Sequence, residues 1–182
     1  NASAVIDEAK YEVANLAYQH VKTQAPEYQP VHVEQTVRIE LPGSSHDLLG
    51  VIDLADDRDR VVDFKTAGKK KAQSDADVNT GLTVYAAAFH VLENRLPSEL
   101  RLDTIVTTKT KVERQVLTTD RGPDDFSAFA WRLNVMNAAV AAGSFSPASP
   151  MAWWCAPKWC GYYNSCPFVN PRRRLGAQEI GR

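Results

Sequence analysis

The chain has little cysteine and almost no net charge, and it lacks long apolar runs. It carries 21 Lys plus Arg against 22 Asp plus Glu, so no overall positive field marks it as a nucleic-acid-binding protein. Any attraction to DNA must therefore be local. No stretch of about 18 apolar residues occurs, so we expect no transmembrane helix and no membrane partner.

Motifs of several common enzyme classes are also missing. The sequence contains no P-loop and no G-x-G-x-x-G, so the chain is not expected to drive ATP-dependent unwinding itself. It contains no G-x-S-x-G elbow, which argues against a serine hydrolase. A length of 182 residues with 44% hydrophobic residues suits a globular chain with a full core.

Hydrophobic periodicity predicts a mixed α/β fold in the order α-β-β-β-α-β-β-α. Helical spacing of apolar residues alternates along the chain with strand-like alternation of apolar and polar residues, and proline or glycine stands near most of the ends. The expected helices are residues 4–24, 77–94 and 123–142, and the expected strands are 31–41, 47–55, 60–66, 100–109 and 112–119.

Two acidic motifs stand on neighbouring strands of this pattern. Gly50-Val51-Ile52-Asp53 is followed, after a polar turn, by Asp63-Phe64-Lys65. A hairpin would place the two carboxylates and the lysine in one pocket. Such oxygen ligands suit Mg²⁺ or Mn²⁺, and a nearby ammonium can stabilise charge on a phosphodiester. An exposed hairpin of alternating charge also produces D-x-K, so the surrounding sequence must decide between the two interpretations.

The two motifs resemble the PD-(D/E)XK nuclease superfamily, and specifically its RecB-like and Cas4-like branch. The resemblance implies a restriction-endonuclease-like mixed β-sheet core flanked by helices. It also implies a Mg²⁺- or Mn²⁺-dependent deoxyribonuclease that acts as an exonuclease. By the same resemblance Asp53 and Asp63 are metal ligands, the backbone carbonyl of Phe64 is a third ligand, and Lys65 is the catalytic lysine.

Other motifs of this branch are present only in part. Its Q-x-x-x-Y helix motif is matched by Tyr85, which the resemblance makes a catalytic residue, while Gly81 stands at the glutamine position. Tyr85 can equally be an aromatic residue of the core. No unambiguous first-helix ligand is found, and His20 is left out of the metal set. Glu34, on the strand before Asp53, is interpreted as part of a polar strand face.

The three cysteines, Cys155, Cys160 and Cys166, all lie within twelve residues, and Pro167 follows the last of them. In the Cas4-like and AddB-like nucleases, such a cluster and a fourth cysteine near the N-terminus hold a [4Fe-4S] cluster. The resemblance therefore implies iron–sulfur binding. Only three cysteines are present, so either an upstream cysteine lies outside this chain, or a different ligand or a three-iron cluster completes the site. A Cys₃His zinc site is the next interpretation, followed by a disulfide with one free thiol.

The expected organisation is a nuclease core over residues 1–143 and a Pro- and Cys-rich tail over residues 144–182 packed on it. Lys69, Lys70 and Lys71 are candidate phosphate contacts, as is the Arg172–Arg174 run. The expected substrate is DNA with free ends, single-stranded or duplex, and a helicase or recombination protein is a candidate partner. We expect a cytoplasmic location in a bacterial or phage-infected cell. A non-catalytic DNA-binding relative and a zinc-stabilised interaction domain are the alternatives.

Overall fold

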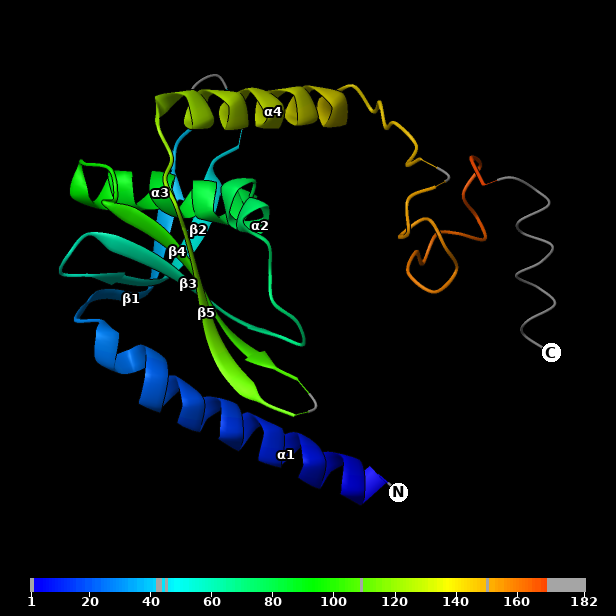
Figure 1. Ribbon diagram of the computed structural model, residues 1–182. Helices are drawn as coiled ribbons and strands as arrows, with labels where there is room; N and C mark the ends of the chain where they lie inside the picture. Colours follow the sequence, from blue (N-terminus) through cyan, green and yellow to red (C-terminus); the bar gives the residue numbers. More distant parts are fainter. Residues whose placement is uncertain (1, 42–43, 45, 109, 150, 170–182) are drawn as a thin grey trace. The chain divides into compact units, whose positions relative to one another are not determined.

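A computed structural model describes residues 2–41, 44, 46–108, 110–149 and 151–169 (Figure 1). The chain divides into two compact units, Asn1–Asn137 and Ala138–Arg182. The helices are α1 (Ala2–Gln19), α2 (Gln73–Asp77), α3 (Thr80–Glu93) and α4 (Pro123–Ala141), and the strands are β1 (Pro30–Ile39), β2 (Leu48–Asp56), β3 (Arg60–Ala67), β4 (Glu99–Thr107) and β5 (Val112–Thr119). Within the described ranges, no helix is both long and apolar enough to span a bilayer.

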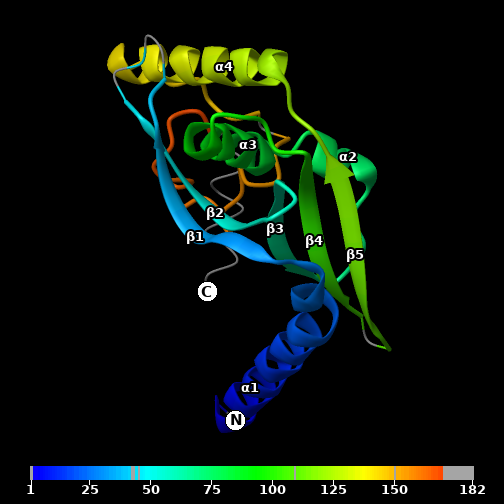
Figure 2. The same cartoon turned by 90° about the vertical axis from the view of Figure 1, so that its left-hand side faces the viewer.

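The first unit is built on one mixed sheet whose strands follow the chain order, β1-β2-β3-β4-β5 (Figure 2). β3 and β4 run parallel, and the other neighbouring pairs are antiparallel. A parallel pair needs a crossover connection, and α2 and α3 lie in that connection. The sheet and its flanking helices confirm the expected restriction-endonuclease-like α/β fold.

The two faces of the sheet bury different side chains. On one face α3 packs its Leu82 and Phe89 against Ile52, Val61 and Leu100, and all five are at most 1% exposed. On the other face Tyr28, Leu54 and Val62 form a smaller cluster, with Phe64 packed against it. Val61 and Val62 point to opposite faces because side chains alternate along a strand. β3 therefore joins both layers of the unit.

The helix expected over residues 77–94 is α3, which begins three residues later, at Thr80, and a short helix that the sequence did not predict, α2, ends at Asp77. Asn79 starts α3 as an N-cap, because its side-chain oxygen accepts a hydrogen bond from the Leu82 N–H at 3.1 Å. Gly81 is thus the second residue of α3, where the helix cost of glycine is small. A Cβ at Gly81 would lie 3.0 Å from the capping oxygen of Asn79.

The helix expected over residues 4–24 also differs in its last turns. α1 ends at Gln19 and continues as a π-helical turn, His20–Gln24, and a 3₁₀ turn, Ala25–Glu27. Pro26 has no N–H to donate, so a regular helix cannot continue through it. The widened turn makes Gln24 a buried residue at the sheet.

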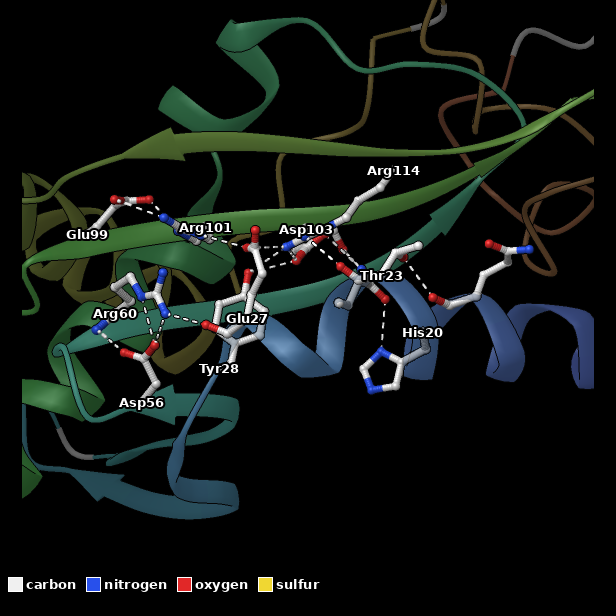
Figure 3. Close-up of polar contacts among 12 residues, drawn as sticks. His20, Thr23, Glu27, Tyr28, Asp56, Arg60, Glu99, Arg101, Asp103 and Arg114 are labelled. Atoms are coloured by element: carbon white, nitrogen blue, oxygen red, sulfur yellow. Dashed lines mark hydrogen bonds and ion pairs between the residues drawn. The ribbon is translucent and has the colours of Figure 1, made fainter.

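Gln24 belongs to a buried polar network that attaches the end of α1 to β4 and β5 (Figure 3). At its centre Asp103, 0% exposed, accepts hydrogen bonds from Gln24 Nε2 at 2.8 Å, Tyr28 Oη at 2.7 Å and Arg114 Nε at 2.9 Å. Burial alone would raise the pKa of Asp103, but the hydrogen bonds from Arg114, Gln24 and Tyr28 lower it below 3.8. Asp103 is therefore a carboxylate at neutral pH.

A second ion pair, between Asp56 and Arg60, closes the β2–β3 turn. The sequence alone predicted only a polar turn there. Arg60 Nε donates to Asp56 Oδ2 at 2.7 Å, and Arg60 Nη2 donates to the Glu27 carbonyl at 2.8 Å (Figure 3). Both Asp56 and Arg60 are buried. The turn is thus fixed to the segment that follows α1, and with it the start of β3.

We expect Asp103→Ala to lower the free energy of unfolding by about 3 kcal/mol, because it leaves the partly buried Arg114 without its carboxylate. Urea denaturation at neutral pH measures the change. The matched control is Asp47→Ala, which removes an exposed ion pair with Arg38 and should cost at most about 1 kcal/mol. Equal losses in the two variants would contradict a structural role for the network.

The hydrogen bonds around Asp103 make the free energy of unfolding depend on pH. A carboxyl group whose pKa is lowered by folding stabilises the protein above its unfolded pKa, and this contribution is lost as the pH falls through the folded value. The stability difference between wild type and Asp103→Ala should therefore be constant near neutral pH and shrink below about pH 3.8, the ordinary value for aspartate.

Candidate active site

The candidate site lies where β2 and β3 separate. The two strands pair at Ala55–Val61 and Leu54–Val62, and the ladder stops there. The next positions in this register are Asp53 and Asp63. The two acidic residues therefore stand opposite each other at the first point where the strands are no longer paired, as the hairpin prediction requires.

Asp53 is fixed by two hydrogen bonds from different elements. Its Oδ1 accepts a hydrogen bond from Tyr85 Oη on α3 at 2.7 Å, and its Oδ2 accepts one from the Phe64 backbone N–H on β3 at 3.0 Å. In a continued ladder Phe64 would pair with residue 52, so the carboxylate replaces a strand partner. Asp53, on β2, therefore connects this strand to β3 through Phe64 and to α3 through Tyr85.

Gly50 explains how α3 comes close enough for this contact. A Cβ at Gly50 would lie 3.1 Å from Val84 Cγ1 and 3.7 Å from Ala88 Cβ, both on α3. A Cβ at this position would be tighter than usual against the Val84 side chain, so that side chain or α3 would have to shift by a few tenths of an ångström. The glycine of the G-x-x-D motif thus allows the next residue of α3, Tyr85, to reach Asp53.

Asp63 and Lys65 form an ion pair near Asp53. Lys65 Nζ lies 2.6 Å from Asp63 Oδ1; the aspartate side chain is 7% exposed and the lysine side chain 53%. Burial raises the pKa of Asp63, Lys65 lowers it, and Asp53 raises it again, so that the pKa lies above 3.8. The ion pair with Lys65 does not fully offset the cost of burying the negative charge of Asp63. A bound cation would stabilise that charge.

Tyr85 keeps its proton in this environment. Burial and the hydrogen bond to Asp53 raise its pKa, and the charges of Asp63 and Glu34 raise it further. It is therefore a hydrogen-bond donor to Asp53 and cannot act as a base at neutral pH.

The sequence interpretation of Glu34 as part of a polar strand face missed a backbone irregularity. Glu34 is opposite Asp53 in the β1–β2 register, between the pairs Val33–Leu54 and Gln35–Ile52. Its φ is +48°, which is unusual for a residue other than glycine. Its carboxylate adds to the negative charge around Tyr85. No residue type in the local sequence signals this conformation.

The backbone N–H of Phe64 bonds to Asp53, and its ring packs against two other aromatic side chains. The ring lies edge-on to His20 at 5.0 Å between centroids and to Tyr28 at 5.9 Å. His20 Nδ1 lies 2.9 Å from Gln24 Oε1. His20 therefore contacts the side chain of Phe64, on the sheet face that the π-helical turn covers.

An open groove of about 590 Å³ runs beside Lys65, between α1 and the sheet. Apolar side chains from both elements line it, including Val13, Leu16, Val21 and Ile105. The ammonium of Lys65 is accordingly accessible from outside the protein.

The other predicted residues lie apart from this pocket. Lys70 pairs with Glu113 at 3.3 Å, and Lys71 contacts Gln115 through its backbone N–H. Lys69, Lys70 and Lys71 are all exposed. Their contact with DNA stays a prediction. Residues 170–182, with the Arg172–Arg174 run, lie outside the described residues.

Cys155, Cys160 and Cys166 are all half-buried in the second unit. They lie in a series of turns, and no helix or strand is present in the described residues from 144 to 169. Among the residues described, no three His, Cys, Asp or Glu side chains form a group that could hold a metal ion. The three thiols are therefore not arranged as a cluster site in this structure.

The donor set at Asp53 and Asp63 nevertheless fits Mg²⁺ or Mn²⁺ better than a metal that requires a complete protein cage. Mg²⁺ is usually held by one or two carboxylates, with water and substrate phosphate as the remaining ligands. Two carboxylates and backbone oxygens are hard donors, and the under-neutralised Asp63 favours a cation.

A five-stranded mixed sheet flanked by helices, with two carboxylates and a lysine at the separation of two central strands, defines a restriction-endonuclease-like α/β protein. The chain belongs to the PD-(D/E)XK nuclease superfamily, whose sequence model matches residues 4–167. Membership supports nuclease activity in general, nucleic acid as the substrate and a divalent metal as the usual cofactor. A comparison with curated proteins finds no match.

Two solved structures are similar to the chain. The crystal structure of "SSO0001" is 15% identical, with a TM-score of 0.47 over 87% of this chain and 69% of that chain. The crystal structure of a "Putative exonuclease" from Eubacterium rectale is 13% identical, with a TM-score of 0.47 over 92% of this chain. The chain spans 64% of the length of the latter protein.

Asp63→Asn should stabilise the metal-free protein at neutral pH. A folded pKa above the unfolded value means that the stabilisation is present below the unfolded pKa and is lost as the pH rises through the folded pKa. A neutral amide removes this penalty and can donate to Asp53, while the lost pair with the exposed Lys65 contributes at most about 1 kcal/mol. Urea unfolding near pH 7 and near pH 3 measures the effect, which should be larger at pH 7. A variant that is less stable at both pH values would contradict it.

Proposed function

We propose that the chain is a Mg²⁺- or Mn²⁺-dependent deoxyribonuclease of the RecB-like and Cas4-like branch, acting as an exonuclease on DNA with free ends. The observation that carries this proposal is the grouping of Asp53, Asp63 and Lys65 at the separation of β2 and β3, with Tyr85 bonded to Asp53. Metal-assisted phosphodiester hydrolysis uses oxygen ligands for the ion and benefits from a nearby protein cation, and Asp53, Asp63 and Lys65 have the chemistry for these roles.

In this proposal Asp53 and Asp63 hold the metal ion. The backbone carbonyl of Phe64 is a third ligand, because the N–H and C=O of one strand residue face the same neighbour, and the Phe64 N–H faces Asp53. When bound, the metal polarises the phosphate and lowers the pKa of a water molecule.

Lys65 and Tyr85 have different tasks. Lys65 is half exposed beside Asp63, so its ammonium can donate to the attacking water or to a phosphate oxygen. Tyr85 donates to Asp53 Oδ1 and thereby fixes the direction of the carboxylate. The glutamine of the Q-x-x-x-Y motif has no counterpart at Gly81, so this site works without its amide.

Lys65→Ala should leave the fold intact and reduce DNA cleavage at least about a hundredfold, because it removes a donor that stabilises charge in the transition state. Degradation of end-labelled single-stranded and duplex DNA with Mn²⁺ or Mg²⁺ measures the loss, and the product ladder gives the polarity of digestion. Lys111→Ala, which removes an exposed lysine paired with Glu113, is the control and should cleave at the wild-type rate.

The outcome separates the nuclease proposal from its alternative, a non-catalytic DNA-binding relative. Cleavage by the wild type that is lost in both Lys65→Ala and Asp63→Ala supports a nuclease that uses this site. DNA binding without any cleavage by the wild type would reject the enzyme and favour the binding protein.

We also propose that Cys155, Cys160 and Cys166 bind a [4Fe-4S] cluster, with zinc as the alternative. Their spacing and the Cys-Pro at the end of the group support this proposal. The three thiols would have to approach one another and take a fourth ligand from elsewhere.

Protein purified without oxygen should therefore be brown, with broad visible absorption and bound iron and sulfide, and Cys160→Ser should remove most of the colour. Asp7→Ser, an exposed substitution in α1, is the control and should keep it. Colourless protein with stoichiometric zinc would replace the iron–sulfur proposal with zinc.

The wider setting follows from the same proposal. A nuclease core over residues 1–143 would work with a tail over residues 144–182, in DNA recombination, repair or phage or CRISPR-type DNA processing. A helicase or recombination protein would supply the DNA end, and the cytoplasm of a bacterial or phage-infected cell would be the location.

A further inference from the structure

The second unit exposes a group of tryptophans. Trp153 lies edge-on to Trp154 at 5.5 Å and to Trp159 at 5.4 Å between ring centroids. Their side chains are 66%, 53% and 58% exposed. Large aromatic side chains gathered at a surface mark a binding site more often than chance exposure does. We call these three side chains the tryptophan group.

The tryptophans are exposed on a backbone that is held in place. Cys155 and Trp159 donate backbone hydrogen bonds to Ala152 and Ala156 at 2.9 and 3.0 Å, which fixes two successive turns. In the same unit Tyr163 and Val169 are buried, at 5% and 6% exposed. The segment therefore buries other apolar side chains and leaves the tryptophan group outside.

The charge around the tryptophan group favours a polyanion. Lys158 Nζ lies 4.8 Å from the centroid of the Trp159 ring. The described residues of the second unit, 138–149 and 151–169, have no Asp or Glu, and Lys158 is their one Lys or Arg. In a chain with a net charge of −1, the described part of this unit is therefore locally basic.

We propose that the tryptophan group, with Lys158, is a binding site for single-stranded DNA, in which bases stack on the indole rings and Lys158 contacts phosphate. The proposal rests on the proposed deoxyribonuclease function and names the form of DNA that the second unit recognises. Aromatic stacking and a local cation are the two elements of sequence-independent single-strand binding. Duplex DNA hides the faces of its bases and should bind less tightly.

The decisive test compares two single strands of equal charge. The full chain, purified without oxygen and without added divalent metal, is titrated with labelled oligothymidylate of about 16 nucleotides and with an abasic strand of the same length. Wild type should bind the oligothymidylate at least about fivefold more tightly, since each stacked base contributes about 1 to 3 kcal/mol. Equal affinity for the two strands would reject stacking.

Variants then assign the effect to the tryptophan group. Trp159→Ala should weaken oligothymidylate binding at least about fivefold and leave abasic binding unchanged, while Trp159→Phe should restore most of the loss. Trp131→Ala is the matched control, since Trp131 is 68% exposed on α4, and it should bind like the wild type. Equal loss in Trp131→Ala and Trp159→Ala would reject the assignment.

Further readouts keep the test independent of folding and of catalysis. Thermal unfolding and bound metal content show whether Trp159→Ala folds, and the wild-type comparison of the two strands decides the proposal if it does not. Trp fluorescence that acrylamide cannot quench in the free protein would show a buried tryptophan group and overturn the proposal. Trp-dependent binding by a protein that never cleaves DNA would reject only the nuclease; cleavage without Trp-dependent binding would reject only the stacking site.

Discussion

The position of the Asp53 carboxylate is the constraint on which the rest of the site depends. One oxygen accepts the Phe64 N–H and the other accepts the Tyr85 hydroxyl, so a single side chain joins β2, β3 and α3. The first bond takes the place of a ladder partner and lets β3 leave β2. The paired segment of β2 and β3 ends there, and the next residue of β3 is Asp63, whose burial disfavours its charged form.

The surrounding strands and helices hold the Asp53 carboxylate in a fixed position. Gly50 lets α3 approach β2, and the network around Asp103 attaches the end of α1 to β4 and β5. Arg60 and Asp56 fix the turn that starts β3. The buried charges in these networks are satisfied by partners, whereas Asp63 is paired only with a half-exposed lysine. Asp63, a buried carboxylate with a raised pKa, is thus one of the residues proposed for catalysis, and shifted pKa values are typical of functional sites.

Most elements follow from local sequence, and the differences have identifiable causes. Alternation and proline positions predicted the five strands within about two residues. The helix expected over 77–94 begins at Thr80 because Asn79 caps its start. The one expected over 4–24 changes form before Pro26, and Gln24 joins the buried network. The sequence predicted a polar turn after residue 55 and a strand from residue 60, but it did not indicate that Asp56 and Arg60 are buried, since Arg60 bonds to Glu27, which is distant in the chain.

The sequence by itself determined the family and the two acidic motifs, and it led to the proposal of Asp53, Asp63, Lys65 and Tyr85 as site residues, because spacing on strands and helices is a local property. Only the tertiary structure decided that Tyr85 meets Asp53, that Gly50 is needed for the helix to approach, and that Glu34 has a positive φ opposite Asp53. These facts depend on how a helix packs on a sheet and on where two strands separate. Both depend on contacts between residues far apart in the chain, and a local sequence pattern does not predict such contacts.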